Sequence, residues 1–327
     1  IRGISSLNPD GNKPLIIVDD IEFTYEQLAQ INVNEIENIS ILKDASTTAI
    51  YGIKGANGVL IVTTRRGVSG RPKINARLEG GLQSPVRKLK FLDSYRSVLL
   101  ENEAYTNDGL NPPFSKEDVE HFRTGDDPYG HPDVNWYEAI FKPYSLQTNA
   151  NVDVSGGNDV VKYFVSGGGF LQNGALKDFS DPRNELNNNY YFRRYNFRSN
   201  LDIKASKSLS VRLDVTARFG DVNQPHAQNI VSEIYNFKKI RPYSAPFLNP
   251  NGSYAYDRYN PGNLPPLNAR LANSGYQRDK RSDLNVLFGF VEKLDMITPG
   301  LSFSGRLAYA STELASRQLF RGGVLEG

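Results

Sequence analysis

Hydrophobic and polar positions change their pattern once along the chain, near Gly70. Before it, apolar residues form short continuous runs, such as the one within 13–20, which is typical of a strand buried on both faces. After it, apolar and polar residues alternate over long stretches, as in strands with one apolar and one polar face. The change predicts an α+β domain over residues 1–68 and an antiparallel sheet over residues 69–327.

The alternation predicts about seven strands, at 73–83, 146–155, 160–171, 190–204, 208–219, 281–294 and 299–313. A sandwich of two sheets would alternate in the same way, so the connections between strands must separate the alternatives. Tight turns at 155–159, 205–208 and 295–300 alternate with long excursions near 84–144, 172–189 and 220–280. A transmembrane β-barrel has this asymmetry, because its periplasmic turns are short and its external loops are long.

The most informative segment runs from Ile36 to Gly67. After the apolar run 39–42, the Asp44 carboxylate is placed to cap a short helix over 45–50, which Tyr51-Gly52 ends. Residues 55–58, Gly-Ala-Asn-Gly, suit a tight turn that tolerates positive φ, and the β-branched run 59–64 suits a strand. The segment therefore predicts a strand, a helical turn, a glycine turn and a second strand.

In these residues the chain resembles the SusC/RagA-like TonB-dependent transporters of the Gram-negative outer membrane. The plug domain of that family ends in a segment of the form LKDAS-x-x-AIYG-x-x-GANGV-x-x-x-TT-[KR]-RG, and residues 42–67 follow it. A loop of a soluble domain is the alternative interpretation. The resemblance implies a structural or gating role for ten residues: Leu42, Lys43, Asp44, Ala45, Tyr51, Gly52, Gly55, Ala56, Asn57 and Gly58.

The resemblance continues less specifically through the later strands. Residues 88–104 resemble the helical segment of the first external loop, and residues 195–201 resemble the fourth strand. The family's barrels have 22 strands, and a sheet of about seven cannot close around a plug or leave its edges unpaired in lipid. We therefore expect the chain to be part of a longer polypeptide, with a plug that lacks its beginning, since Ile1-Arg2-Gly3 resembles the middle of a plug.

The resemblance implies import of an oligosaccharide or a peptide across the outer membrane, gated by the plug. The implied partners are a SusD-like surface lipoprotein, outer-membrane lipid and the TonB complex, which would act through an N-terminal segment absent from this chain. Pairs of transporter and lipoprotein form dimers in many members. The alternatives are a surface glycan-binding module and an outer-membrane signal-transducing receptor that does not transport.

The composition excludes several classes of protein and of site. The formal net charge of +2 over 327 residues lacks the concentrated basic excess of a nucleic-acid-binding protein. The absence of cysteine excludes disulfides and thiol chemistry, and no apolar run approaches the roughly 20 residues of a spanning helix. Aromatic residues in or beside the predicted strands suit interfacial girdles or ordinary core packing: Tyr190, Tyr191, Phe192, Tyr195, Phe197, Phe219, Phe288, Phe290, Phe303 and Tyr309.

We find no arrangement of catalytic residues, and we expect neither an enzyme nor a cofactor. The histidines His121, His131 and His226 lie in predicted loops without metal-ligand spacing, so we expect them to be solvated. The acidic residues near 126–133 are a conceivable Ca²⁺ site but lack the spacing of a calcium loop, and turn chemistry is the better interpretation. Residues 52–58 lack the Lys-Ser/Thr pair of a phosphate-binding loop.

Tyrosine and tryptophan in the predicted external loops are candidates for contact with a ligand or a partner. Aromatic faces with polar rims suit sugar rings and peptides, and loop packing is the alternative role. The candidates are Tyr129, Trp136, Tyr137, Tyr254, Tyr256 and Tyr259.

The glycines of residues 55–58 generate the first testable prediction. We expect Gly55→Val or Gly58→Val to damage folding or seating of the plug rather than substrate affinity, because these glycines serve backbone geometry. Thermal unfolding and substrate binding of the purified protein measure the two effects separately. Native thermal stability with weakened binding would contradict the prediction.

Overall fold

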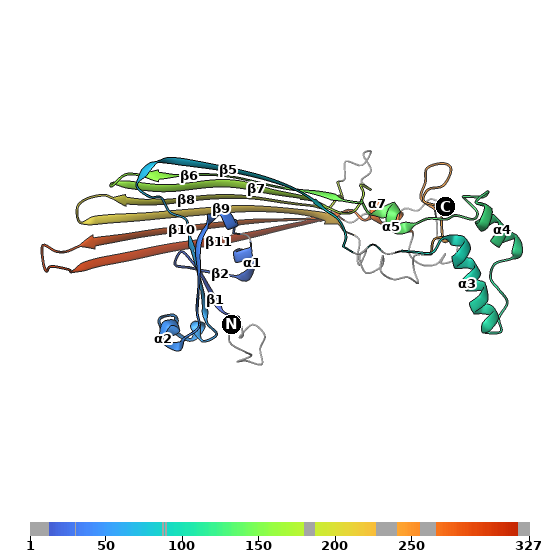
Figure 1. Ribbon diagram of the computed structural model, residues 1–327, viewed down its shortest axis with the longest axis horizontal. Coiled ribbons are helices and arrows are strands. Elements are labelled where there is room, and N and C mark those ends of the chain that lie inside the picture. The colour runs from blue at the N-terminus through green and yellow to red at the C-terminus, as the bar shows by residue number, and fades with distance from the viewer. Residues whose placement is uncertain are drawn as a thin grey trace.

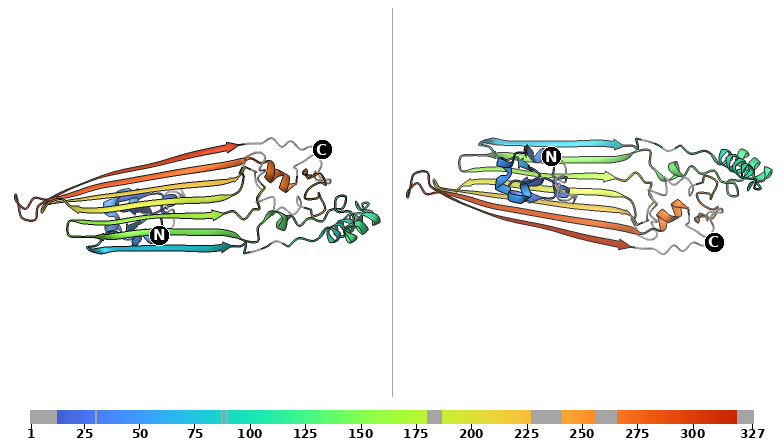
Figure 2. Two further views of the ribbon diagram at one scale, coloured as in Figure 1. Left: turned by 90° about the horizontal axis from the view of Figure 1, so that it is seen from above. Right: turned by 90° about the horizontal axis from the view of Figure 1, so that it is seen from below.

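The computed structural model describes residues 13–29, 31–86, 88, 90–179, 187–226, 241–255 and 266–319. Within them the chain forms a mixed four-stranded sheet and an antiparallel seven-stranded sheet (Figure 1). The small sheet with its helices, residues 13–68, is called the N-terminal unit below, and the large sheet is called the wall. The unit lies against one face of the wall, over the part of the strands nearer the tight turns (Figure 2).

The N-terminal unit has the strand order β2-β1-β4-β3. Its elements are β1 (Leu15–Val18), β2 (Ile21–Phe23), α1 (Tyr25–Ala29), the 3₁₀ helix η2 (Val33–Glu35), β3 (Ile36–Leu42), α2 (Ala45–Thr48), the 3₁₀ helix η3 (Ala49–Gly55) and β4 (Val59–Thr64). Strand β1 is central, and Ile16 and Val18 pack with Phe23, Ile31 and Val62 in the core of the unit. The strand predicted from this apolar run is therefore present and buried.

The order predicted for residues 36–67 is also present, with three differences in detail. The helix is α-helical only over α2 and continues as η3 with a kink at Gly52, where φ is 58°. Asp44 occupies the N-cap position, but its carbonyl rather than its carboxylate accepts the amides of Thr47 and Thr48. Gly58 has the expected positive φ of 93°, whereas Gly55 is needed because a Cβ there would lie 2.8 Å from the Thr48 carbonyl oxygen.

The wall contains all seven predicted strands in sequence order. They are β5 (Gly70–Gln83), β6 (Ser145–Gly157), β7 (Val161–Asn173), β8 (Tyr191–Lys204), β9 (Leu209–Pro225), β10 (Tyr276–Lys293) and β11 (Ser302–Leu319). Strands β9 and β10 extend several residues into the stretch predicted as a loop. Their ladder continues past the alternating segment, where Arg278 Nη2 and Asp221 Oδ2 lie 2.6 Å apart across the two strands.

The polar face of the wall is the covered face. Asn151 and Asp153 are buried, whereas Leu146 and Val152 on the opposite face of β6 are about half exposed. A soluble sheet packs its apolar face on a core, so the reversed arrangement suits a sheet with lipid outside and a polar interior. Aromatic rings on the outward face are exposed, as interfacial girdles require: Tyr195, Phe197, Phe219, Phe288, Phe303 and Tyr309.

The long connections carry the remaining helices, which are α3 (Ser94–Asn107), α4 (Lys116–Thr124), α5 (Trp136–Ile140) and α7 (Leu267–Asn273). Helix α3 begins six residues later than the helical segment predicted at 88–104, because the Asp93 carboxylate caps it by accepting the Arg96 amide at 2.8 Å. Helices α5 and α7 share a hydrophobic cluster beyond the ends of the strands. No helix of the described residues is long and apolar enough to cross a membrane.

Candidate functional site at the contact between the N-terminal unit and the wall

The β1–β2 hairpin turn places two carboxylates against the wall. Asp19 and Asp20 connect the strands directly, and both have positive φ, 46° and 72°. A two-residue turn of this kind usually contains glycine or asparagine, since positive φ strains most other residues. Strained backbone of this kind persists where surrounding contacts hold it in place.

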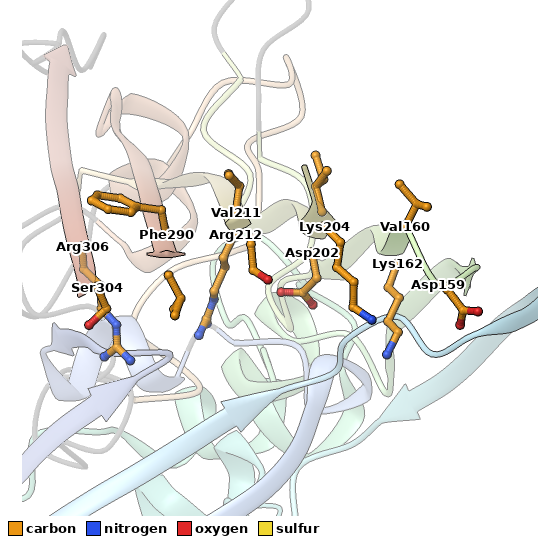
Figure 3. A pocket seen from close by; sticks show the side chains of 14 residues that line it. Asp159, Val160, Lys162, Asp202, Lys204, Val211, Arg212, Phe290, Ser304 and Arg306 are labelled. Carbon is orange, nitrogen blue, oxygen red and sulfur yellow. The ribbon is translucent and has the colours of Figure 1, made fainter. Parts of the chain in front are cut away.

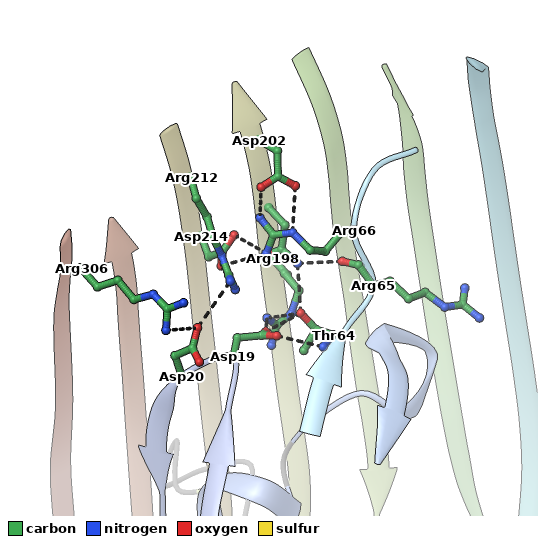
Figure 4. A network of polar contacts seen from close by, with 11 residues as sticks. Asp19, Asp20, Thr64, Arg65, Arg66, Arg198, Asp202, Arg212, Asp214 and Arg306 are labelled. Carbon is green, nitrogen blue, oxygen red and sulfur yellow. Dashed lines mark hydrogen bonds and ion pairs between the residues drawn. The ribbon is translucent and has the colours of Figure 1, made fainter. Parts of the chain in front are cut away.

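Asp19 is held by contacts from the unit and from the wall (Figure 4). Its carboxylate accepts the Thr64 amide at 3.0 Å and the Thr64 hydroxyl at 2.5 Å, which ties the turn to the end of β4. Arg198 on β8 donates from Nη1 to Asp19 Oδ2 at 3.1 Å and to the Thr64 hydroxyl at 3.1 Å. Arg198 of the wall therefore binds both the strained turn and the end of β4.

Glu35 provides the second carboxylate for the same arginine. It is the last residue of η2, and the side chain of Asn32 caps this helix by accepting the Asn34 amide. Glu35 Oε2 accepts from Arg198 Nε at 2.9 Å, and both side chains are almost fully buried, with 1% and 2% exposed. Glu35 Oε1 accepts from Asn196 Nδ2 at 2.6 Å and from Ser166 Oγ at 3.0 Å, so strands β7 and β8 both bind it.

Arg66, just after β4, forms the converse contact, with a cation on the unit and anions on the wall (Figure 4). Its guanidinium binds Asp202 with two hydrogen bonds of 2.7 and 2.8 Å and reaches Asp214 at 3.1 Å. Burial disfavours the charged form, but the hydrogen bonds to Asp202 and Asp214 outweigh it and raise the pKa of Arg66 above its usual value. Arg66 is therefore charged in this contact at any physiological pH.

Next to Arg66 the chain passes directly over a wall strand. A Cβ built on Gly67 would lie 2.2 Å from the Tyr163 amide nitrogen, so only glycine fits between the two backbones. Asn200 on β8 holds the same segment by donating to the Arg65 carbonyl at 2.7 Å. The residues that connect the unit to β5 are thus fixed against β7 and β8.

A second group of contacts lies nearer solvent. Asp20 is 3.1 Å from Arg306 and 3.5 Å from Arg212, and the Arg306 side chain is 64% exposed. These two arginines line a pocket toward the tight-turn ends of the strands, together with Asp202, Lys162 and Lys204 (Figure 3). Water therefore reaches the Asp20 contacts, whereas the Glu35–Arg198 pair is closed to it.

The contact is mainly polar in its described part. None of the three hydrophobic clusters joins the unit to the wall: one lies within residues 16–62 and the other two lie in the long connections. Arg218 faces the unit and stacks over the Phe23 ring at 5.3 Å, but its Nε and Nη2 have no hydrogen-bond partner among the described residues. Such a surface binds through directional polar contacts and can separate without exposing an apolar core.

The structure places the ten signature residues away from these contacts. Helices α2 and η3 lie on the side of the unit remote from the wall (Figure 1), and η3 is tied to β2 by the Lys54–Glu22 ion pair of 2.7 Å. The signature therefore shapes the unit, and its predicted gating role stays a prediction. Glu35 and Asp19 carried no sequence signal, because their partners in the wall lie more than 120 residues away.

The predicted aromatic residues of the loops differ in how far their side chains are exposed. Tyr129 is 51% exposed, and Tyr254 is half-buried. Trp136 and Tyr137 lie in the hydrophobic cluster of α5 and α7, and the Trp136 indole donates to the Arg241 carbonyl at 3.1 Å, so both have the packing role. Tyr256 and Tyr259 lie outside the described residues, and ligand contact stays a prediction for the group.

The expectation of solvated histidines is wrong for His131. Its side chain is 14% exposed and stacks on His121 with the ring centroids 4.7 Å apart, because α4 and the following turn bring the two rings together. Asp127 and Asp118 bind the two nitrogens of His131 at 2.8 and 3.1 Å, and Asp126 binds His121 at 2.8 Å. The described residues contain no group of histidine and acidic side chains suited to a metal ion.

Comparison with known proteins agrees with this architecture. Residues 1–59 match the family model of the TonB-dependent receptor plug domain. TonB-dependent receptor P26 of Formosa agariphila is 32% identical over 258 residues, which cover 78% of this chain and 23% of that protein. TonB-dependent receptor SusC of Bacteroides thetaiotaomicron is 31% identical over 187 residues, 54% of this chain and 17% of that protein.

A solved structure of the RagAB peptide transporter superposes with a TM-score of 0.67 and 19% identity, covering 93% of this chain and 35% of that one. The chain belongs to the SusC/RagA-like TonB-dependent transporters. Proteins of this family are outer-membrane β-barrels, so the wall is part of a barrel and the protein is located in the outer membrane. The chain spans between 17% and 26% of the length of the curated relatives that it matches.

Substitution of Arg198 directly tests how the N-terminal unit is held against the wall. We expect Arg198→Met to destabilise seating of the N-terminal unit by about 3–5 kcal/mol, because it leaves Glu35 and Asp19 buried without their cation. Arg306→Gln, at the exposed pair, should cost less than about 1 kcal/mol. The urea dependence of protease protection of the unit, measured in the full-length protein, gives both values.

Equal effects of the two substitutions would contradict the assignment of Arg198 as the main anchor. Adding Glu35→Gln to Arg198→Met should recover part of the loss, because it removes the unpaired charge. No recovery would show that lost packing, rather than charge, causes the effect.

The His121–Asp126 pair predicts a pH dependence outside the membrane. The hydrogen bond to Asp126 raises the pKa of His121, so its contribution to local stability is present below pH 6.5 and is lost as pH rises through the raised pKa. The hydrogen-exchange protection factors of α4, which are corrected for the intrinsic pH dependence of amide exchange, should therefore fall above that pH in the native protein. His121→Gln should remove the dependence and Lys116→Gln should keep it; the same pH profile in all three proteins would contradict the prediction.

Proposed function

We propose that the whole protein imports an oligosaccharide or a peptide across the outer membrane in a TonB-dependent manner, with the N-terminal unit as the gate. The observation that carries the proposal is the polar contact between the unit and the wall. A permanent plug would be held most simply by apolar packing, whereas the described contact relies on charged pairs around Arg198 and Arg66. Such contacts exchange for water at modest cost once force is applied.

The contact also suggests an order of release. The Asp20 pairs with Arg212 and Arg306 are exposed and adjoin the pocket of Figure 3, so they are the weaker contacts. The Glu35–Arg198 pair is dry and stronger, and it would hold the unit until the end of the movement. Pulling from the periplasm would therefore open the pocket side first.

The proposed partners follow from the family. RagAB, in the structure to which this chain is similar, is a peptide importer, and the relatives are TonB-dependent receptors. We propose that a SusD-like lipoprotein covers the external side, in a dimer of transporter–lipoprotein pairs, and that the TonB complex supplies the force. The nutrient class is left open between oligosaccharide and peptide.

Deletion of the full-length gene tests the proposal. Uptake of labelled oligosaccharides and peptides should fall for at least one class and return with the native gene. Arg198→Met should restore less transport than native, and Glu22→Gln, which removes an exposed ion pair within the unit, should restore it fully. Unchanged uptake across the panel, with a lost transcriptional response to the nutrient, would identify a signal-transducing receptor instead.

A further inference from the structure

A pocket at the long-loop ends of three neighbouring strands carries a concentration of lysine. It is lined by residues that follow β5, precede β6 and follow β7, and four of them are Lys88, Lys90, Lys142 and Lys177. We call it the lysine pocket. No part of the proposed gate or of the sequence signature uses these residues.

Backbone pairing fixes two of the lysines. An isolated bridge joins Phe141 to Leu176, and the amides of Lys142 and Lys177 donate to the carbonyls of Ala175 and Ile140, each at 2.7 Å. Phe141 and Leu176 pack against the hydrophobic cluster of α5 and α7. Lys142 and Lys177 are therefore held beside that cluster.

The charge of the lysine pocket is not balanced by the described residues. Glu138 is its one lining carboxylate, against four ammonium groups, and Lys177 Nζ binds the Glu138 carbonyl at 2.7 Å rather than the carboxylate. None of the four lysines forms an ion pair with an acidic side chain of the described residues. Two arginines elsewhere in the long connections are paired, Arg241 with Glu101 at 3.2 Å and Arg123 with Glu120.

Aromatic rings form the apolar part of the same pocket. Phe91, Tyr137 and Phe141 line it, and the rings of Tyr137 and Phe141 lie 4.7 Å apart. A ring surface beside lysine side chains accommodates a molecule that has an apolar part and an anionic group. The pocket lies just beyond strands whose outward residues, such as Leu82 and Leu146, are exposed and apolar.

We propose that the lysine pocket binds phosphate groups of the lipid around the barrel, specifically a phosphorylated glycolipid of the outer leaflet. The long loops of a membrane barrel lie on the external side, which places the pocket near the headgroups of that leaflet. Four lysines line the pocket against one carboxylate, and each ammonium group would donate to phosphate oxygens. Lipid binding would anchor the first external loop, and it is independent of what the protein transports.

Binding of lipid A to the full-length protein in detergent tests the proposal. We expect Lys142→Gln/Lys177→Gln to weaken binding of phosphorylated lipid A roughly 10- to 30-fold, from the contribution expected of two lysines at a charged surface. Raising the salt concentration should weaken binding by the native protein. The matched control is Lys116→Gln/Lys207→Gln, which removes two exposed lysines outside the pocket and should bind as the native protein does.

Dephosphorylated lipid A and inorganic phosphate distinguish the sources of the anionic group. The native protein should bind the dephosphorylated lipid at least tenfold more weakly, and millimolar inorganic phosphate should not displace the phosphorylated lipid. Equal affinity for the two lipids, equal binding by the pocket variant and the native protein, or full displacement by inorganic phosphate would each overturn the proposal. Unchanged thermal unfolding of the pocket variant confirms that it is folded.

Discussion

The buried ion pair between Glu35 and Arg198 determines how the two parts of this structure fit together. Removing two charges from water is costly, and the cost is offset only when each charge finds several well-placed partners. Asn196 and Ser166 supply them for Glu35, and Asp19 and Thr64 supply them for Arg198. Because the pair and its partners come from three elements of the unit and two strands of the wall, the pair forms only when the unit is correctly seated.

The wall makes this contact possible because its faces are reversed relative to a soluble sheet. Lipid solvates the apolar outward residues, so the inward residues are free to be polar. That polar face provides the arginine, asparagine and serine side chains that bind the N-terminal unit. The polar inward face also explains why the contact contains no hydrophobic cluster of described residues. Such a contact is compatible with a gate that opens and closes.

Two groups of residues therefore have different roles in the unit: one shapes it and the other contacts the wall. The glycine-rich signature builds its shape, with the kink at Gly52 and the close approach at Gly55, on the side remote from the described wall. Arg66 and Gly67, at the end of the same segment, contact the wall directly through an ion pair and a backbone crossing. The signature residues and the residues that contact the wall are adjacent in sequence but have different roles.

The sequence by itself determined the order of elements within residues 36–67, the seven strands of the wall, the asymmetry of turns and loops, and the family, because each depends on local periodicity or on a contiguous motif. Only the tertiary structure decided which face of the wall is covered, since alternation is the same in lipid and in water. It also decided that Glu35 and Asp19 meet Arg198, that His121 stacks on His131, and that Trp136 is buried. These contacts join residues that lie far apart in the chain or on either side of an unpredicted turn, and no local pattern records them.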